Sequence, residues 1–200
     1  MGQAKRREKE ILILKQRNTV WLDSLKDEER KITEVVLNAH KKIIEGMGMV
    51  GGCYYMTGFL YLYLKRELGI YTNPVVGYVN DGESELMISH AWLEYEGKII
   101  DITITRTEVP EIQIEGSLLI LDHEWKKGKG KYSYHYDKTD FAKQADSDLA
   151  QSEFGRKALR VKEDEHLRMH EMMSNDDEIE KYLNSAPHPQ SYISFSKVLS

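Results

Sequence analysis

The feature that most constrains the fold is a change in the spacing of apolar residues near residue 70. Before this point, apolar residues recur at the three- and four-residue spacing of a helix buried on one side, as in Ile32, Val35, Val36, Ala39 and Ile43. After it come short β-branched or aromatic stretches, separated by turn-forming sequences such as Asn80-Asp81-Gly82 and Glu96-Gly97. Because the strands follow the helices rather than alternating with them, we predict an α+β fold with helices packed on an antiparallel sheet.

Capping and turn residues set approximate bounds for these elements. The expected helices are 4–17, 24–45 and 53–68. The expected strands are 74–80, 86–95, 99–105, 112–121 and 132–136. Ser24 with Asp27 predicts the start of the second helix, and Gly69 predicts the end of the third. Gly58 is unfavourable inside a helix, which predicts a close approach of another segment at that point.

The composition changes beyond residue 140. Helical spacing with many charged residues runs from 141 to 173, and a polar segment containing serine and proline covers 184–200. We therefore expect two parts in the chain. Residues 1–140 would form a catalytic domain with N-terminal helices, and residues 141–200 would form a charged helical C-terminal extension that could dock a protein partner.

The charge and apolar content restrict the partners of the chain. The longest apolar run near the middle covers only 59–64, whereas a membrane-spanning helix needs about 20 residues. The basic start lacks the apolar core of a secretory signal, so we expect a cytoplasmic protein with no membrane partner. The net charge of −5 argues against a nucleic-acid partner. Residues 126–131 alternate lysine and glycine and are interpreted as a solvated loop, with polyanion binding as the alternative.

Cys53 is the only cysteine in the chain. It therefore cannot form an intramolecular disulfide or, by itself, a cysteine-based zinc site, which leaves a buried inert thiol or a nucleophile. The predicted third helix begins at Cys53, and a helix N-terminus favours a thiolate through its partial positive charge and its unbonded N–H groups. Gly52 precedes it and would let the backbone approach a substrate closely.

His90 and Asp101 lie in two predicted strands on either side of the Glu96-Gly97 turn. A connection of two or four residues pairs positions whose numbers sum to 193, which places Trp92 opposite Asp101. His90 and Asp101 are then diagonal neighbours on one face, about 7 to 8 Å apart at the backbone and within reach of each other's side chains. A connection of odd length would place the two side chains on opposite faces.

These segments resemble a known family. The residues that carry the resemblance are Gly52-Cys53, Leu60, Leu64, Leu68-Gly69-Ile70, Pro74-Val75-Val76-Gly77-Tyr78, His90-Ala91-Trp92-Leu93-Glu94 and Ile100-Asp101. Over about residues 50–104 the chain resembles the core of the transglutaminase-like, papain-related superfamily of cysteine proteases and acyltransferases. The arginine that commonly precedes the second motif in that family is replaced here by residues 72–74, Thr-Asn-Pro.

The resemblance implies a papain/transglutaminase-like core and a Cys-His-Asp triad. Cys53 would be the nucleophile, His90 the base and acid, and Asp101 the residue that orients the imidazole. Gly52, Tyr54 and Trp92 are the expected substrate-binding residues. Asn38 or His40, on the preceding helix, are weak candidates for an additional oxyanion donor.

The expected function is cysteine-dependent acyl transfer on amides. Hydrolysis of a peptide or carboxamide bond, as by a protease, amidase or deamidase, is favoured, and transglutaminase-type transfer to an amine stays open. We expect a protein or peptide substrate, no metal and no cofactor. The alternative is a non-catalytic binding or interaction module on the same scaffold. His166 and His170 have a spacing that metals can use, but without a third ligand they are interpreted as a solvated helix face.

Overall fold

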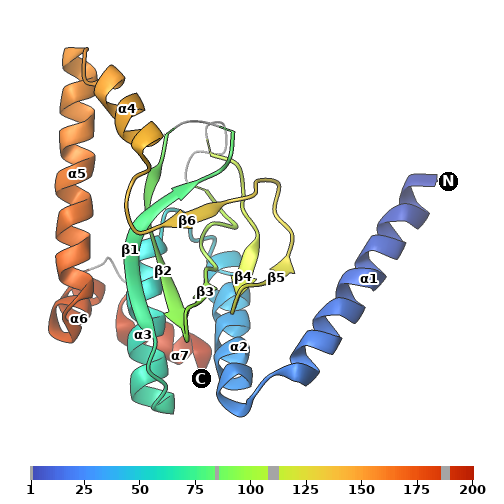
Figure 1. The fold of residues 1–200 in the computed structure, drawn as a ribbon. Coiled ribbons are helices and arrows are strands. Elements are labelled where there is room, and N and C mark those ends of the chain that lie inside the picture. The colour runs from blue at the N-terminus through green and yellow to red at the C-terminus, as the bar shows by residue number, and fades with distance from the viewer. Residues whose placement is uncertain (1, 84–85, 108–112, 186–189) are drawn as a thin grey trace.

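The structure, a computed structural model, describes residues 2–83, 86–107, 113–185 and 190–200. In these ranges the chain forms an α+β fold, as predicted, with seven α-helices, one π-helix and six strands (Figure 1). The helices are α1 (Gly2–Ser24), α2 (Asp27–Ala39), the π-helix η1 (His40–Glu45), α3 (Cys53–Leu68), α4 (Asp140–Leu149), α5 (Glu153–Met173), α6 (Asp176–Ser185) and α7 (Tyr192–Leu199). The strands are β1 (Asn73–Asn80), β2 (Ile88–Tyr95), β3 (Lys98–Ile100), β4 (Leu118–Ile120), β5 (His123–Lys126) and β6 (Ser133–His135).

The main sheet has the strand order β3-β2-β1-β6, and all its neighbours are antiparallel. Strands β4 and β5 form a separate pair. Asp101 connects the two sheets, because its backbone N–H and carbonyl exchange hydrogen bonds with Leu119 of β4 at 2.9 and 3.0 Å. In the β2–β3 hairpin Leu93 pairs with Ile100, so the predicted register is confirmed.

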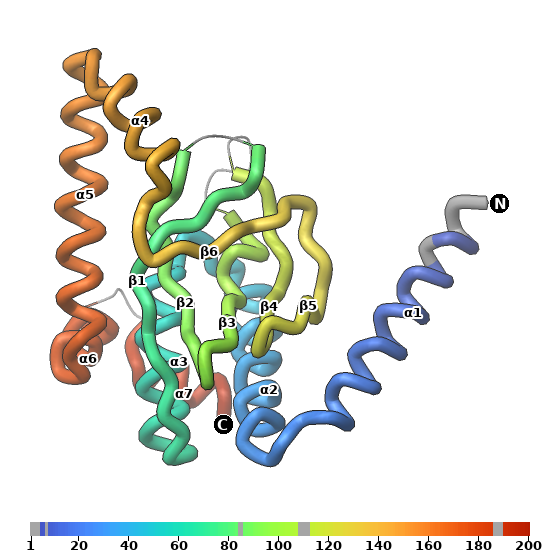
Figure 2. The backbone as a smooth tube through the Cα atoms, in the orientation of Figure 1, coloured from blue at the N-terminus to red at the C-terminus, as the bar shows by residue number. Residues whose placement is uncertain are grey.

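Helices cover the sheet and also pack on one another. Helix α3 lies against β1 and β2, and α5 runs along β1 (Figure 1). Helices α6 and α7 pack against α3, and α7 also contacts α2 and η1. Helix α1 projects away from this body (Figure 2). The C-terminal part of α1 contacts β5. None of the described helices is long and apolar enough to cross a membrane.

The third predicted helix is confirmed, and the first two differ in their bounds. Helix α3 starts at Cys53 and ends before Gly69, whose φ of 66° is the left-handed conformation that glycine adopts easily. The predicted cap at Ser24 is wrong, because Ser24 ends α1; α2 instead begins after Lys26, whose N–H is bound by the Glu29 carboxylate at 2.9 Å. The second helix also widens into a π-helix from His40.

Strand β1 closely matches its predicted bounds, and the other predicted strands are shorter than expected. The strand predicted at 99–105 ends at Ile100, because the Asp101 carboxylate accepts the Thr103 N–H at 2.9 Å and turns the chain. The strand predicted at 112–121 is reduced to β4; residue 112 lies outside the described residues, and 113–117 form no strand. Strand β5 was not among the expected strands.

The helical character predicted for the C-terminal part is confirmed over 141–173, and further helices follow. The 141–173 region divides at Ser152, whose hydroxyl caps α5 by accepting the Gly155 N–H at 2.9 Å. Helices α6 and α7 were not predicted; α7 lies within the segment expected to be polar, yet Phe195 is fully buried. These helices contribute to the same apolar core as α2 and α3.

Candidate active site at the start of helix α3

Cys53 is the first residue of α3 and a partly exposed free thiol. The loop before it turns through Gly48 and Gly51, which have φ values of 70° and 62°. A Cβ at Gly52 would lie 2.5 Å from the sulfur of Met49, so a larger residue there would require the Met49 side chain to move. The first helical hydrogen bond runs from the Met56 N–H to the Gly52 carbonyl at 2.9 Å. The N–H groups of the first turn are therefore available near the thiol.

The two other predicted triad residues contact each other. His90 Nε2 lies 2.7 Å from Asp101 Oδ2, and the exposed fractions of the two residues are 6% and 3%. This contact agrees with the predicted diagonal placement on one face of the hairpin. A buried ion pair of this kind is costly unless its remaining polar atoms are also bonded.

Asp101 satisfies that condition. Its Oδ1 accepts hydrogen bonds from the backbone N–H and the hydroxyl of Thr103, each at 2.9 Å, and Oδ2 also accepts from the Tyr134 hydroxyl at 2.8 Å. Burial alone would raise the pKa of Asp101. The charge and hydrogen bond of His90, together with hydrogen bonds from Thr103 and Tyr134, instead hold this pKa below its usual value. The carboxylate is thus kept ionised and fixed in orientation.

The Cys53 side chain lies close enough to the imidazole of His90 to affect its pKa. Burial lowers the pKa of His90, but the charge of Asp101, together with the charge and hydrogen-bonding of Cys53, raises it to about 10. Because Nε2 is bound to Asp101, Nδ1 is the ring nitrogen left for the thiol. The structure therefore brings together all three predicted triad residues, from α3, β2 and the turn after β3.

Tyr134 was not predicted as part of this site. The sequence predicted only that it lies in a strand, and β6 pairs with β1, 50 or more residues earlier in the chain. Tyr134 also packs edge-on against Trp92, with ring centroids 5.3 Å apart. The alternation of tyrosines in 132–136 was the available signal, but it does not identify the neighbouring strand.

The predicted substrate-binding residues have different surroundings. Tyr54 is half-buried and its hydroxyl lies 2.8 Å from the hydroxyl of Ser89 on β2; burial raises its pKa above the usual value. Trp92 is only 2% exposed, and its ring covers Gly77, where a Cβ would lie 2.5 Å away. This burial favours a packing role for Trp92. Substrate binding by Gly52, Tyr54 and Trp92 stays a prediction.

The two candidate oxyanion donors are bonded elsewhere. Asn38 donates from Nδ2 to the Leu199 carbonyl at 3.1 Å, which fastens η1 and α2 to the end of α7. His40 is buried, and its Nε2 lies 3.1 Å from Thr105 Oγ1. Neither contact directs the side chain towards Cys53.

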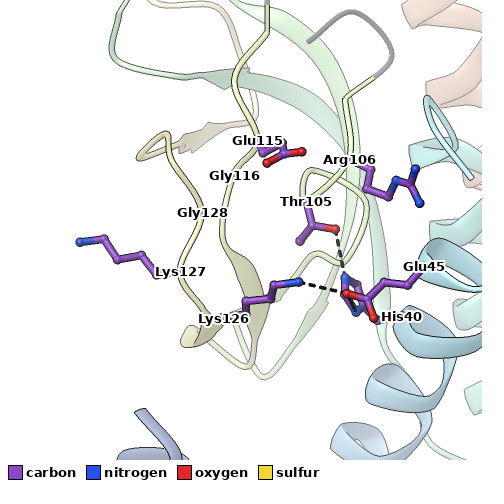
Figure 3. Close-up of a pocket in the computed structure, with 9 residues that line it drawn as sticks. All are labelled: His40, Glu45, Thr105, Arg106, Glu115, Gly116, Lys126, Lys127 and Gly128. Carbon is purple, nitrogen blue, oxygen red and sulfur yellow. Dashed lines mark hydrogen bonds and ion pairs between the residues drawn. The ribbon is translucent and has the colours of Figure 1, made fainter. Parts of the chain in front are cut away.

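His40 lies instead at a separate cavity of about 430 Å³ (Figure 3). Its lining residues are His40, Glu45, Thr105, Arg106, Glu115, Gly116, Lys126, Lys127 and Gly128. Lys126 is paired with Glu45 at 3.0 Å, and Lys127 extends away from the other side chains in Figure 3. Lys129, in the same loop, is paired with Glu115 at 3.2 Å. Two of the four lysines in 126–131, the segment considered for polyanion binding, are thus paired with carboxylates.

The interpretation of His166 and His170 as one solvated face is wrong for His166. It is 7% exposed, its Nδ1 lies 2.6 Å from Ser89 Oγ, and its ring stacks on Tyr78 with centroids 4.3 Å apart. The reason is that α5 packs along β1, so this position of the helix faces the sheet. His170, one turn later, is exposed.

Among the residues described, no group of three or more His, Cys, Asp or Glu side chains is placed to hold a metal ion.

Comparisons with protein-family models, with curated proteins and with solved structures found no match for this chain.

Proposed function

We propose that this protein is an enzyme that transfers acyl groups from amides through Cys53, His90 and Asp101, on a core of the papain/transglutaminase-like kind. The observation that carries the proposal is the buried 2.7 Å contact between His90 Nε2 and Asp101 Oδ2, on an imidazole that also interacts with the thiol of Cys53. A nucleophile, a base and a residue that orients the base are the parts required for covalent acyl transfer.

The proposed reaction follows from these positions. His90 holds the proton of the Cys53 thiol as an imidazolium, and the thiolate sulfur of Cys53 attacks the carbonyl carbon of an amide. Unbonded N–H groups in the first turn of α3 stabilise the negative oxygen of the tetrahedral intermediate. The C–N bond then breaks, and His90 gives its proton to the departing amine, leaving a thioester on Cys53. Asp101 holds the imidazole in one orientation and stabilises its charged form.

The fate of the thioester distinguishes the reaction types. Attack by water, with His90 as base, releases a carboxylic acid and regenerates the thiol, as in a protease, amidase or deamidase. Attack by an amine forms a new amide, as in a transglutaminase. We favour hydrolysis, with a peptide or protein as the substrate, because small members of the superfamily that the sequence resembles are often protease-like.

The first prediction concerns the reactivity of the thiol. Because Cys53 is the only cysteine, the alkylation of thiol by iodoacetamide reports on this residue alone. We expect alkylation at about pH 6 to 7 to be faster than that of a free cysteine peptide, and His90→Ala to lower the rate by at least about tenfold. His170→Ala, which changes an exposed histidine on α5, is the matched control and should leave the rate unchanged.

The same measurement tests the non-catalytic alternative. A binding module would not need an activated thiol, so alkylation no faster than that of the peptide, with no effect of His90→Ala, would refute the enzyme proposal. Where the thiol is activated, a screen of peptides and amides, with and without a primary amine as acceptor, separates hydrolysis from transfer by the mass of the product.

A further inference from the structure

A chain of hydrogen bonds connects the C-terminal helix α5 to the two elements that carry the nucleophile and the base. The Tyr54 hydroxyl lies 2.8 Å from Ser89 Oγ, and Ser89 Oγ lies 2.6 Å from His166 Nδ1. Tyr54 directly follows Cys53 on α3, and Ser89 directly precedes His90 on β2. His166, on α5, therefore lies at the end of a chain of hydrogen bonds. The other two residues of this chain, Ser89 and Tyr54, are sequence neighbours of His90 and Cys53.

His166 is held firmly in this position. It is 7% exposed and stacks on the ring of Tyr78, the residue that pairs with Ser89 across the β1–β2 ladder. The ammonium of Lys138 also lies 5.0 Å from the centre of the Tyr78 ring. Figures 1 and 2 show α5 running beside β1, so the histidine reaches the sheet without a bend in the helix.

The pKa shifts of His166 and Tyr54 are compatible with one direction of donation along the hydrogen-bond chain. Burial is the main reason that the pKa of His166 lies below its ordinary value, and burial likewise raises the pKa of Tyr54. A neutral imidazole with an unprotonated Nδ1 accepts from the Ser89 hydroxyl, and Ser89 then accepts from the neutral Tyr54 hydroxyl. In this tautomer the Tyr54 hydroxyl, Ser89 Oγ and His166 Nδ1 each have a hydrogen-bond partner of the right kind.

We propose that His166 is a positioning residue, which acts through Ser89 and Tyr54 to keep Cys53 and His90 at a fixed position relative to each other. The inference rests on the proposed function, and it assigns to the C-terminal part of the chain a task in the chemistry. The physical basis is that a displacement of about 1 Å between reacting groups can lower a rate by about a hundredfold. A link that joins the neighbours of both groups limits such displacements.

The test uses the full chain and the alkylation rate of Cys53 as a function of pH. We expect His166→Ala to lower the rate near neutral pH by about tenfold or more. His166→Asn, whose amide oxygen can accept from Ser89 in place of Nδ1, should restore most of the rate. Leu167→Ala, which changes a side chain that is 53% exposed on the same helix, is the matched control and should behave as the unchanged protein.

A double-mutant cycle distinguishes positioning from a general loss of stability. If His166 acts through Ser89, then Ser89→Ala and His166→Ala each lower the rate and the double variant lowers it no further, because residues in one network are not additive. Tyr54→Phe keeps the ring and removes only the hydroxyl, so it provides a variant that folds should the alanine variants fail. It should change the alkylation profile in the same direction.

The outcomes separate the inference from the proposed function. If His90→Ala slows alkylation but His166→Ala and Tyr54→Phe do not, the positioning role is overturned and the enzyme proposal stands. Additive effects of Ser89→Ala and His166→Ala, or no rescue by His166→Asn, also overturn the positioning role. If His90→Ala leaves alkylation unchanged, the proposed function fails, and the positioning role fails with it.

Discussion

Asp101 shows how a single side chain serves both the fold and the candidate site. Its Oδ1 binds the backbone and hydroxyl of Thr103, which ends strand β3, while its Oδ2 binds His90 and Tyr134. A buried carboxylate is stable only when its oxygens are bonded. The hydrogen bonds that stop the strand are therefore also the ones that hold the carboxylate in place beside the imidazole.

The His90–Asp101 pair predicts a specific pH dependence of stability. The pKa of His90 is raised in the folded protein from 6.5 to about 10. Its contribution is therefore fully present below about pH 6.5 and is lost as the pH rises towards 10. The free energy of unfolding is measured in urea across this pH range. As the pH rises, the unchanged protein should lose stability relative to His90→Gln, because the amide of glutamine does not titrate. Parallel pH profiles of the two proteins would show that the folded state does not favour the imidazolium.

At the scale of elements, α3 is the central helix of the molecule. Its first residue carries the thiol, and farther along the helix it packs against the sheet, α6 and α7. Gly58, which the sequence marked as a point of close approach, faces α6; a Cβ there would lie 2.8 Å from Cγ2 of Ile179, which is fully buried. Glycine at this position allows the two helices to approach closely.

We expect Gly58→Ala to destabilise the protein by about 1 to 3 kcal/mol through overpacking. Alanine is favoured over glycine in a helix by about 1 kcal/mol, so in open space the same change would be stabilising. The sign therefore reports on the contact with Ile179, and the free energy of unfolding in urea measures it. In an Ile179→Ala background, where room is available, Gly58→Ala should cost less; an equal cost in both backgrounds would contradict the contact.

At the scale of the whole molecule, the C-terminal helices share the core of the preceding residues. Phe195 of α7 packs edge-on against Phe59 of α3, with ring centroids 5.1 Å apart, and Ile179 and Leu183 of α6 are fully buried in the same core. Charged residues dominate the exposed faces of α4 to α6. This exposed charge explains why the composition beyond residue 140 suggested an extension.

This shared core predicts one cooperative unfolding transition. Phe195→Ala should cost about 3 to 5 kcal/mol, as expected for a large buried side chain, and should lower the unfolding midpoint seen by tryptophan fluorescence and circular dichroism equally. Phe154→Ala removes a ring that is 83% exposed on α5 and is the matched control, with little expected change. Two separate transitions, with only the later helices affected by Phe195→Ala, would show that residues 141–200 fold independently.

Local patterns in the sequence were sufficient to predict the start and end of α3 and the register of the β2–β3 hairpin. A helix is defined by periodicity, a capping glycine and its first residue, all within one short segment. A hairpin register follows from the length of its turn. The placement of His90 beside Asp101 needed no information from elsewhere in the chain, because these residues are separated by only one turn.

Only the tertiary structure determined that Tyr134 binds the Asp101 carboxylate, that His166 reaches Ser89, and that Phe195 is buried. These contacts join segments 33 or more residues apart. Periodicity and turn length describe a chain only over one or two elements, whereas the burial of a histidine on a charged helix depends on which sheet face that helix covers. The sequence by itself thus determined the elements that carry the candidate triad, and the packing of distant segments determined what surrounds it.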